Sequence, residues 1–197
     1  MSERPDSEAE ILRRYLRAGY EALRWKLDGL SEYDLRRPLV ASGTNLLGVA
    51  KHVALVTAEY FALVFDRPSA VPAFPEGDPN ADMWATADEP AATVLAWLDT
   101  AAAEVDATLA ELPLDTPGHV PWWGGERPNT TLRAVAVHTL AELHRHAGQV
   151  DIVRELIDGE IGWNKGRENL PGEADGVDAA WWSAYRDRLQ SLAESFR

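Results

Sequence analysis

Three side chains that could bind a metal ion lie on one face of a predicted helix in the second half of the chain. In segment 137–149, His138, Glu142 and His146 are spaced by four residues, and residues four apart are neighbours on a helix surface. A Glu and a His in this relation present a carboxylate oxygen and an imidazole nitrogen to the same point. Glu142 and His146 could therefore form half of a divalent-metal site, with the rest supplied by another helix.

The best candidate for the other half is His52, in the otherwise apolar segment 48–56, which has a helical pattern. A histidine on a buried face needs a hydrogen-bond partner or a metal. Two His and one carboxylate with an open fourth position is the ligand set of catalytic zinc, although nickel, iron and manganese also suit it. Taken separately, His52 could be a hydrogen-bonded core residue, and Glu142 and His146 an ordinary surface pair. From the residues alone, one ion bound by all three is a hypothesis beside these alternatives.

Other polar residues near these positions have more open roles. His138, one turn before the predicted ligand pair, could be a further ligand or could donate a hydrogen bond to a ligand's carboxylate. Gln149 falls on the same stripe. Glu59, two turns after His52 on the same predicted helix, could be a fourth ligand or a solvated carboxylate. His119 lies in a loop and His144 faces the opposite side of its helix, so neither is expected to be a ligand.

These residues resemble a known superfamily. A His in the second helix followed by Glu142-x-x-x-His146-Ala-Gly-Gln-x-Asp-Ile is similar to the DinB-like four-helix metalloproteins, in particular the branch of mycothiol-dependent maleylpyruvate isomerase and mycothiol S-transferases. Many members have a second His where this chain has Glu142, whereas the isomerase branch has Glu. The resemblance extends from the first helix to Gly159. The isomerase's additional C-terminal domain is not expected here, so maleylpyruvate is not the expected substrate.

The resemblance implies a transferase in which a bound metal activates a low-molecular-weight thiol, mycothiol or bacillithiol, for attack on an electrophile. The chain has no cysteine, so nucleophilic sulfur has to come from a ligand, and disulfides and Cys-ligated zinc are excluded. Two other functions remain open. The same site could activate water in a hydrolase, for which Glu59 is the nearest candidate acid or base, or the protein could bind metal without catalysis in a stress response.

Charge and length narrow the class of protein further. The 197 residues carry a net charge of −13, which argues against nucleic acid and against an anionic membrane surface as partners. The length suits one domain with a full core. The N-terminal residues are polar and lack the apolar stretch of a secretory signal, so we expect a cytoplasmic protein.

Apolar periodicity, caps and proline positions predict the elements that position the site. The expected helices cover about 7–30, 45–65, 88–112, 129–158 and from 178 onward, separated by connectors at 34–38, 66–88, 113–129 and 161–177. We therefore predict an all-α, DinB-like four-helix bundle with an additional C-terminal helix packed on it, as one domain (1–197) with its core at 7–159 and an extension at 160–197. No strand is expected.

Tryptophans in the connectors and in the last helix suggest contact surfaces. Trp84 could cover the mouth of a pocket, and Trp122 and Trp123, directly before the metal-binding helix, could contact substrate, although all three could equally fill gaps at the ends of the core. The last helix carries Trp181, Trp182 and Tyr185. Apolar patches of this kind mark interfaces, so we expect a homodimer.

Overall fold

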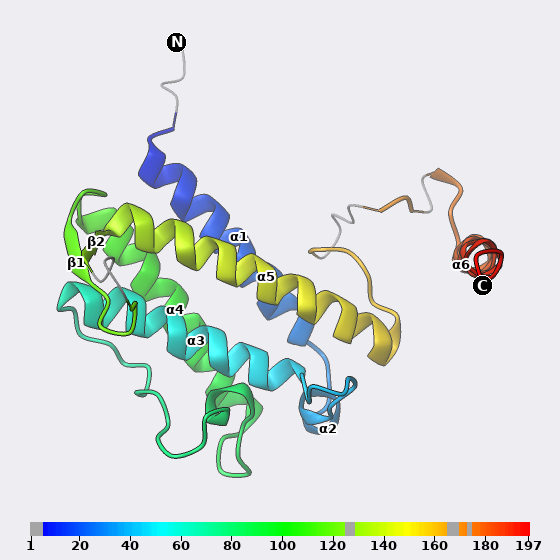
Figure 1. Ribbon diagram of the computed structural model, residues 1–197, viewed down its shortest axis with the longest axis horizontal. Helices are drawn as coiled ribbons and strands as arrows, with labels where there is room; N and C mark the ends of the chain where they lie inside the picture. Colours follow the sequence, from blue (N-terminus) through cyan, green and yellow to red (C-terminus); the bar gives the residue numbers. More distant parts are fainter. Residues whose placement is uncertain (1–5, 125–128, 165–169, 173–174) are drawn as a thin grey trace. The chain divides into compact units, whose positions relative to one another are not determined.

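Four long helices form the body of the protein in a computed structural model. The structure describes residues 6–124, 129–164, 170–172 and 175–197. The long helices are α1 (Glu8–Leu27), α3 (Leu46–Ala62), α4 (Ala91–Glu111) and α5 (Leu132–Asp158). Each of α1 and α3 packs against both α4 and α5, which places α3 beside α5 in the bundle (Figure 1). The predicted all-α, DinB-like four-helix bundle is confirmed.

Shorter elements occupy the connections. They are α2 (Glu32–Arg36), the 3-10 turns η1 (Leu63–Phe65) and η2 (Ala81–Met83), and the strands β1 (Pro117–His119) and β2 (Asn129–Thr131). The additional C-terminal helix is α6 (Ala179–Glu194). The chain divides into two compact units, Met1–Glu160 and Ile161–Arg197. The packing of α6 on the bundle and the single domain remain predictions.

Caps set the helix ends largely as the sequence indicated. Ser7 and Glu10 form the predicted capping box at the start of α1. Asn45 accepts a hydrogen bond from the backbone N–H of Gly48 at 2.8 Å and so starts α3. Gly159, with φ of 81°, ends α5 in the left-handed conformation that glycine tolerates best. Asp178 caps α6 through the N–H of Trp181.

Two segments differ from the prediction. The first helix ends at Leu27 rather than about residue 30. The short helix α2 overlaps the predicted connector at 34–38, because Ser31 caps a new turn through the N–H of Asp34. Residues 129–131 were expected only to cap the fourth helix. Thr131 does cap α5 through the N–H of Ala134, but the three residues also form β2, which pairs antiparallel with β1. Three-residue strands containing proline and glycine have no period-two signature, so this hairpin could not be seen in the sequence.

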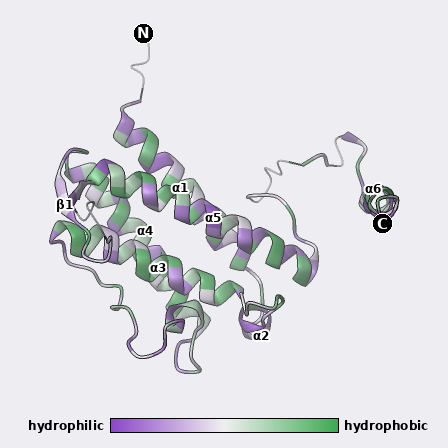
Figure 2. Cartoon of the chain, in the orientation of Figure 1, coloured by the Kyte–Doolittle hydropathy of each residue, from purple (hydrophilic) through white to green (hydrophobic). Residues whose placement is uncertain are grey.

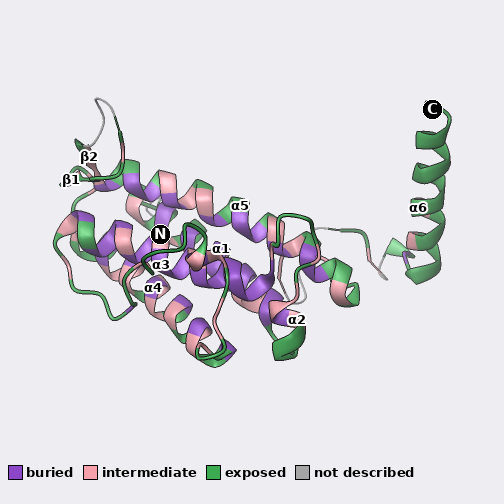
Figure 3. Cartoon of the chain, turned by 60° about the horizontal axis from the view of Figure 1, so that its bottom comes forward, coloured by how far each residue is buried: buried purple, intermediate pink, exposed green. Residues whose placement is uncertain are grey.

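The core fills the space between the four long helices. Figure 2 shows hydrophobic and hydrophilic residues alternating along α1 and α5, and Figure 3 shows buried residues concentrated on the inner sides of the bundle helices. The segment Leu46–Phe65 is long and apolar enough to span a membrane, but 78% of the tested window is buried inside the protein. It has the character of the central helix of a bundle. A helix buried on nearly all sides offers few positions for polar residues, so His52 on it needs an explanation.

Candidate metal centre

The α5 half of the candidate site consists of Glu142 and His146. The two side chains lie one turn apart on the same helix, and the distance from His146 Nε2 to Glu142 Oε2 is 3.6 Å. Two ligands at a tetrahedral zinc ion lie about 3.4 Å apart when each metal–ligand distance is about 2.1 Å. The α5 half is therefore close to ligand spacing before any other residue is considered.

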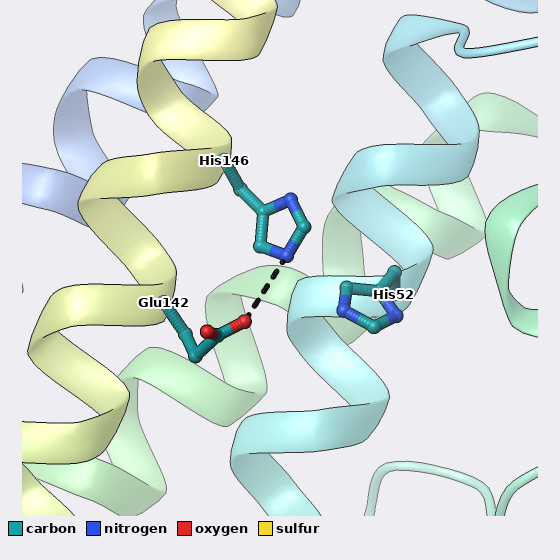
Figure 4. A group of neighbouring side chains, drawn as sticks. All are labelled: His52, Glu142 and His146. Atoms are coloured by element: carbon teal, nitrogen blue, oxygen red, sulfur yellow. Dashed lines mark ion pairs between the residues drawn. The ribbon is translucent and has the colours of Figure 1, made fainter. Parts of the chain in front are cut away.

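The α3 half is His52, which faces this pair across the seam between the two helices (Figure 4). The imidazole rings of His52 and His146 meet edge to face with their centroids 4.7 Å apart. One ligand atom from each of His52, Glu142 and His146 lies within 4.8 Å of the other two. The structure thus brings together the three residues that the sequence predicted as metal ligands.

Both imidazoles are held by a hydrogen bond at Nδ1. His52 Nδ1 lies 2.5 Å from a carboxylate oxygen of Asp82, and His146 Nδ1 lies 2.9 Å from the side-chain oxygen of Gln149. Each oxygen accepts, so each Nδ1 donates its hydrogen. With Nδ1 engaged in this way, Nε2 is the ring atom that could bind a metal, and this is the usual arrangement for metal-bound histidines.

Burial favours the neutral form of the His146 ring. Burial lowers the pKa of His146 below its usual range, and this outweighs the opposing effects of Gln149 and Glu142. One ring nitrogen of each histidine and the Glu142 carboxylate converge on a small volume. Such a group of acceptors is electrostatically unfavourable by itself. A divalent cation satisfies all three, so the residues fit a metal.

Two other sequence candidates lie outside this group of donors. Glu59 lines a separate cavity of about 280 Å³ together with Arg67 and Phe74, and burial raises the pKa of its carboxyl group. It does not converge with the triad, so a fourth ligand at this position is not supported. His138 forms no hydrogen bond with Glu142 among the described residues. Its predicted role as a donor to the ligand carboxylate is not seen.

His138 belongs instead to an aromatic cluster with Tyr60, Trp122 and Trp123. The indole N–H groups of both tryptophans donate to the hydroxyl of Tyr60, at 3.2 Å and 2.8 Å. The His138 ring packs against Tyr60 and Trp123 at centroid distances of 5.1 Å and 5.2 Å. Tyr60 is eight residues after His52 and His138 eight before His146, so the cluster lies about 12 Å along the same seam.

The remaining candidates lie as expected or have local partners. His119 is exposed on β1 and bonds to Asn129. His144 is exposed, and its Nε2 contacts the backbone oxygen of Tyr15. Neither is among the converging donors. Trp84 is 43% exposed and donates to Asp78 in its own connector.

Asp82 is a polar contact of the site that sequence reasoning missed. It lies in a proline-rich connector, 30 residues from the histidine it contacts. Helical periodicity says nothing about such a pairing. The only signal in the sequence is indirect, since a histidine on an apolar helix requires a polar partner from somewhere.

Comparisons with known proteins agree with this architecture. A sequence model of the family described as Mycothiol-S-transferase matches residues 11–159. No curated protein has a significantly similar sequence. A solved structure of a conserved protein from Enterococcus faecalis is similar with a TM-score of 0.57 and 14% identity, over 79% of this chain and all of that one, which supports the bundle fold alone. Because the family match spans the four bundle helices and most of the chain, the protein belongs to the mycothiol S-transferase family of the DinB-like superfamily.

Proposed function

We propose that this protein is a metal-dependent S-transferase that joins the sulfur of a small thiol to an electrophilic carbon. The observation that carries the proposal is the convergence of His52, Glu142 and His146 in a chain whose family is thiol-dependent. Zinc is the first candidate ion for this ligand set, with nickel, iron and manganese as alternatives. When bound, such an ion favours the thiolate form of a thiol, which is the nucleophilic form.

The residues of the chain supply position rather than a reacting group. Without any cysteine, the protein cannot provide the sulfur, so the thiol is a substrate: mycothiol first, with bacillithiol as the alternative. In the transfer, the carbon–sulfur bond forms with the sulfur electron pair. The leaving group departs with the electron pair of its bond to carbon, and the thiol proton passes to solvent.

The aromatic cluster is the candidate binding surface for the electrophile. Both indole N–H groups are already bonded to Tyr60, so Trp122 and Trp123 offer apolar faces rather than donors. Trp122 remains 41% exposed. His138 is half-buried and has no hydrogen-bond partner among the described residues, which leaves it free to bond a polar atom of a bound molecule. We propose that this surface holds an apolar or planar electrophile.

The structure gives the hydrolase alternative no support of its own. A metal-dependent hydrolase needs an acid or base beside the reacting water. Glu59, the only carboxylate proposed for that role, lines a different cavity. Hydrolysis and metal binding without catalysis are therefore the alternatives that the experiment has to distinguish from thiol transfer.

The test measures metal content and thiol conjugation on the same samples. We expect the purified wild-type protein to retain one divalent ion per chain, measured by elemental mass spectrometry. We also expect it to conjugate mycothiol to a bromobimane faster than it conjugates glutathione to the same compound. His146→Ala should lose both properties. His144→Ala is the matched control, because His144 lies on the same helix but is exposed and faces away from the site; it should keep both.

Each contrary result points to a different alternative. Stoichiometric metal in His146→Ala would show that the ligand assignment is wrong. An intact metal site without conjugation of mycothiol, bacillithiol or glutathione would contradict the transferase proposal. Ester or amide hydrolysis by that protein would then favour the hydrolase, and no turnover at all would favour a metal-binding module.

The homodimer and the cytoplasmic location remain predictions. Trp181 and Tyr185 on α6 stack with their ring planes 10° apart, and α6 has no buried residue among those described. Exposed aromatic surface of this kind suits an interface between two copies. A monomeric mass by light scattering at micromolar concentration would contradict the dimer.

A further inference from the structure

A buried carboxylate on the connector between α3 and α4 touches the candidate metal centre from outside. Asp82 lies in η2, its side chain is only 12% exposed, and its Oδ2 is 2.5 Å from Nδ1 of His52. Asp82 is not one of the three residues whose ligand atoms converge. The carboxylate accepts a hydrogen bond from Nδ1–H. This bond fixes the orientation of the ring and turns Nε2 toward Glu142 and His146.

The residues that follow Asp82 hold the connector against α3. The backbone oxygen of Met83 accepts a hydrogen bond from the side chain of Asn45 at 3.3 Å. The next residue, Trp84, accepts at its backbone oxygen from the buried Lys51 at 3.1 Å. Lys51 also pairs with Glu89 farther along the connector at 2.8 Å. These contacts span the first two turns of α3, directly before His52.

Close approach of the connector depends on a glycine. Gly48 is buried in α3, and a Cβ atom placed on it would lie 1.8 Å from the backbone oxygen of Met83 and 2.5 Å from its carbonyl carbon. Such a clash involves backbone atoms, so no side-chain rotation can relieve it. Any residue other than glycine would push the connector, and Asp82 with it, away from the helix.

We propose that Asp82 is a positioning residue for the metal centre and that Gly48 is the residue that permits its position. The inference rests on the proposed function, because it assumes that His52 binds a metal. Metal affinity then depends on two residues that contact no metal. By linkage, the ion and the docked connector stabilise each other: binding at His52 favours the docked segment, and the docked segment favours binding.

The experiment compares five single variants with the wild type, using metal affinity and the state of the His52 ring as readouts. Zinc affinity is measured by competition with a chromophoric chelator. The His52 tautomer is measured in the metal-free protein by nitrogen-15 NMR. Asp82→Ala should lower zinc affinity by about 10–100-fold and should lower the population of the Nδ1–H tautomer. Asp82→Asn, whose amide oxygen can still accept, should retain the tautomer and lose less affinity.

The steric half of the proposal has its own variant and control. Gly48→Ala should lower zinc affinity and disturb the His52 tautomer although Asp82 is intact, and should speed amide exchange in 81–84. Gly148→Ala is the matched control, since a Cβ there meets nothing within 4 Å. Asp78→Ala removes another carboxylate from the same connector, one that contacts Trp84 rather than His52. Both controls should keep wild-type affinity.

The outcomes separate this inference from the proposed function. Asp82→Ala with wild-type affinity and tautomer overturns the inference even if the wild type conjugates thiols. Weak zinc binding in Asp82→Ala supports the inference even if the wild type transfers no thiol. A wild-type protein that binds no divalent metal overturns both. If Gly48→Ala does not fold, Asp82→Ala and Asp82→Asn decide the role of Asp82, and faster exchange in 81–84 of the zinc-free wild type than of its zinc form supports the linkage.

Discussion

Replacing Gln149 by Ala tests the other outer contact of the metal centre. The side-chain oxygen of Gln149 accepts from His146 Nδ1 at 2.9 Å, three residues along the same helix. Losing such a partner costs about 10–100-fold in metal affinity. The acceptor is a neutral amide and is partly exposed, so the loss belongs at the low end. We expect about a tenfold rise in the zinc dissociation constant, which corresponds to about 1.4 kcal/mol.

The measurement is a competitive zinc titration at fixed pH and ionic strength, with helix content checked by circular dichroism. Gln149→Glu is the informative partner variant. Its carboxylate accepts the same proton and adds a negative charge beside the imidazole, so affinity should equal or exceed that of the wild type. Wild-type affinity in Gln149→Ala, or a loss in Gln149→Glu as large as in the alanine variant, would refute the view that Nδ1 acceptance orients His146.

Three further predictions concern the bundle that carries the site. Thr139 is buried and its hydroxyl has no partner in the described structure, so Thr139→Val should raise the free energy of unfolding in urea by about 1 kcal/mol; a loss of that size would contradict this. Arg154 donates to two carbonyl oxygens at the C-terminal end of α1, so Arg154→Met should cost about 3 kcal/mol in the same assay, and a cost below 1 kcal/mol would be incompatible with the capping role. Arg13 and Arg17 lower the pKa of Asp106 in the folded protein. The stability that this carboxylate contributes is fully present above its pKa in the unfolded chain, about 3.9, and is lost as the pH falls toward its pKa in the folded protein. Asp106→Asn should therefore flatten the acid side of the plot of unfolding free energy against pH, and an unchanged slope would contradict this.

The helical half of the site could be predicted because helix geometry alone fixes it. Glu142, His146 and Gln149 lie on one helix at spacings of four and three, and any helix over this segment brings them to one face. The role of His52 was harder to predict, because its place beside α5 depends on how the bundle packs. A histidine on an apolar helix indicated a special environment, and the family resemblance supplied the pairing.

The connectors could not be predicted, because their positions depend on contacts that are distant in sequence. Residues 113–129 were expected to be irregular, but part of this segment pairs as β1 and β2. Gly118 of β1 packs so closely on η1 that a Cβ atom would lie 2.7 Å from a side-chain atom of Val64. The position of Trp122 and Trp123 shortly before α5 is visible in the sequence. Their hydrogen bonds to Tyr60 depend on how this connector folds, which the sequence does not show.

The two halves of the candidate metal centre therefore differ in what maintains them. On α5, Glu142, His146 and Gln149 keep their relation whenever that helix is formed. On α3, the orientation of His52 depends on Asp82, which is 30 residues away and reaches the ring only when its connector is docked. Long loops open more easily than packed helices. Partial opening of the connector should release the His52 ring first while His146 stays in place, so loss of metal should begin at the ligand that the helix itself does not orient.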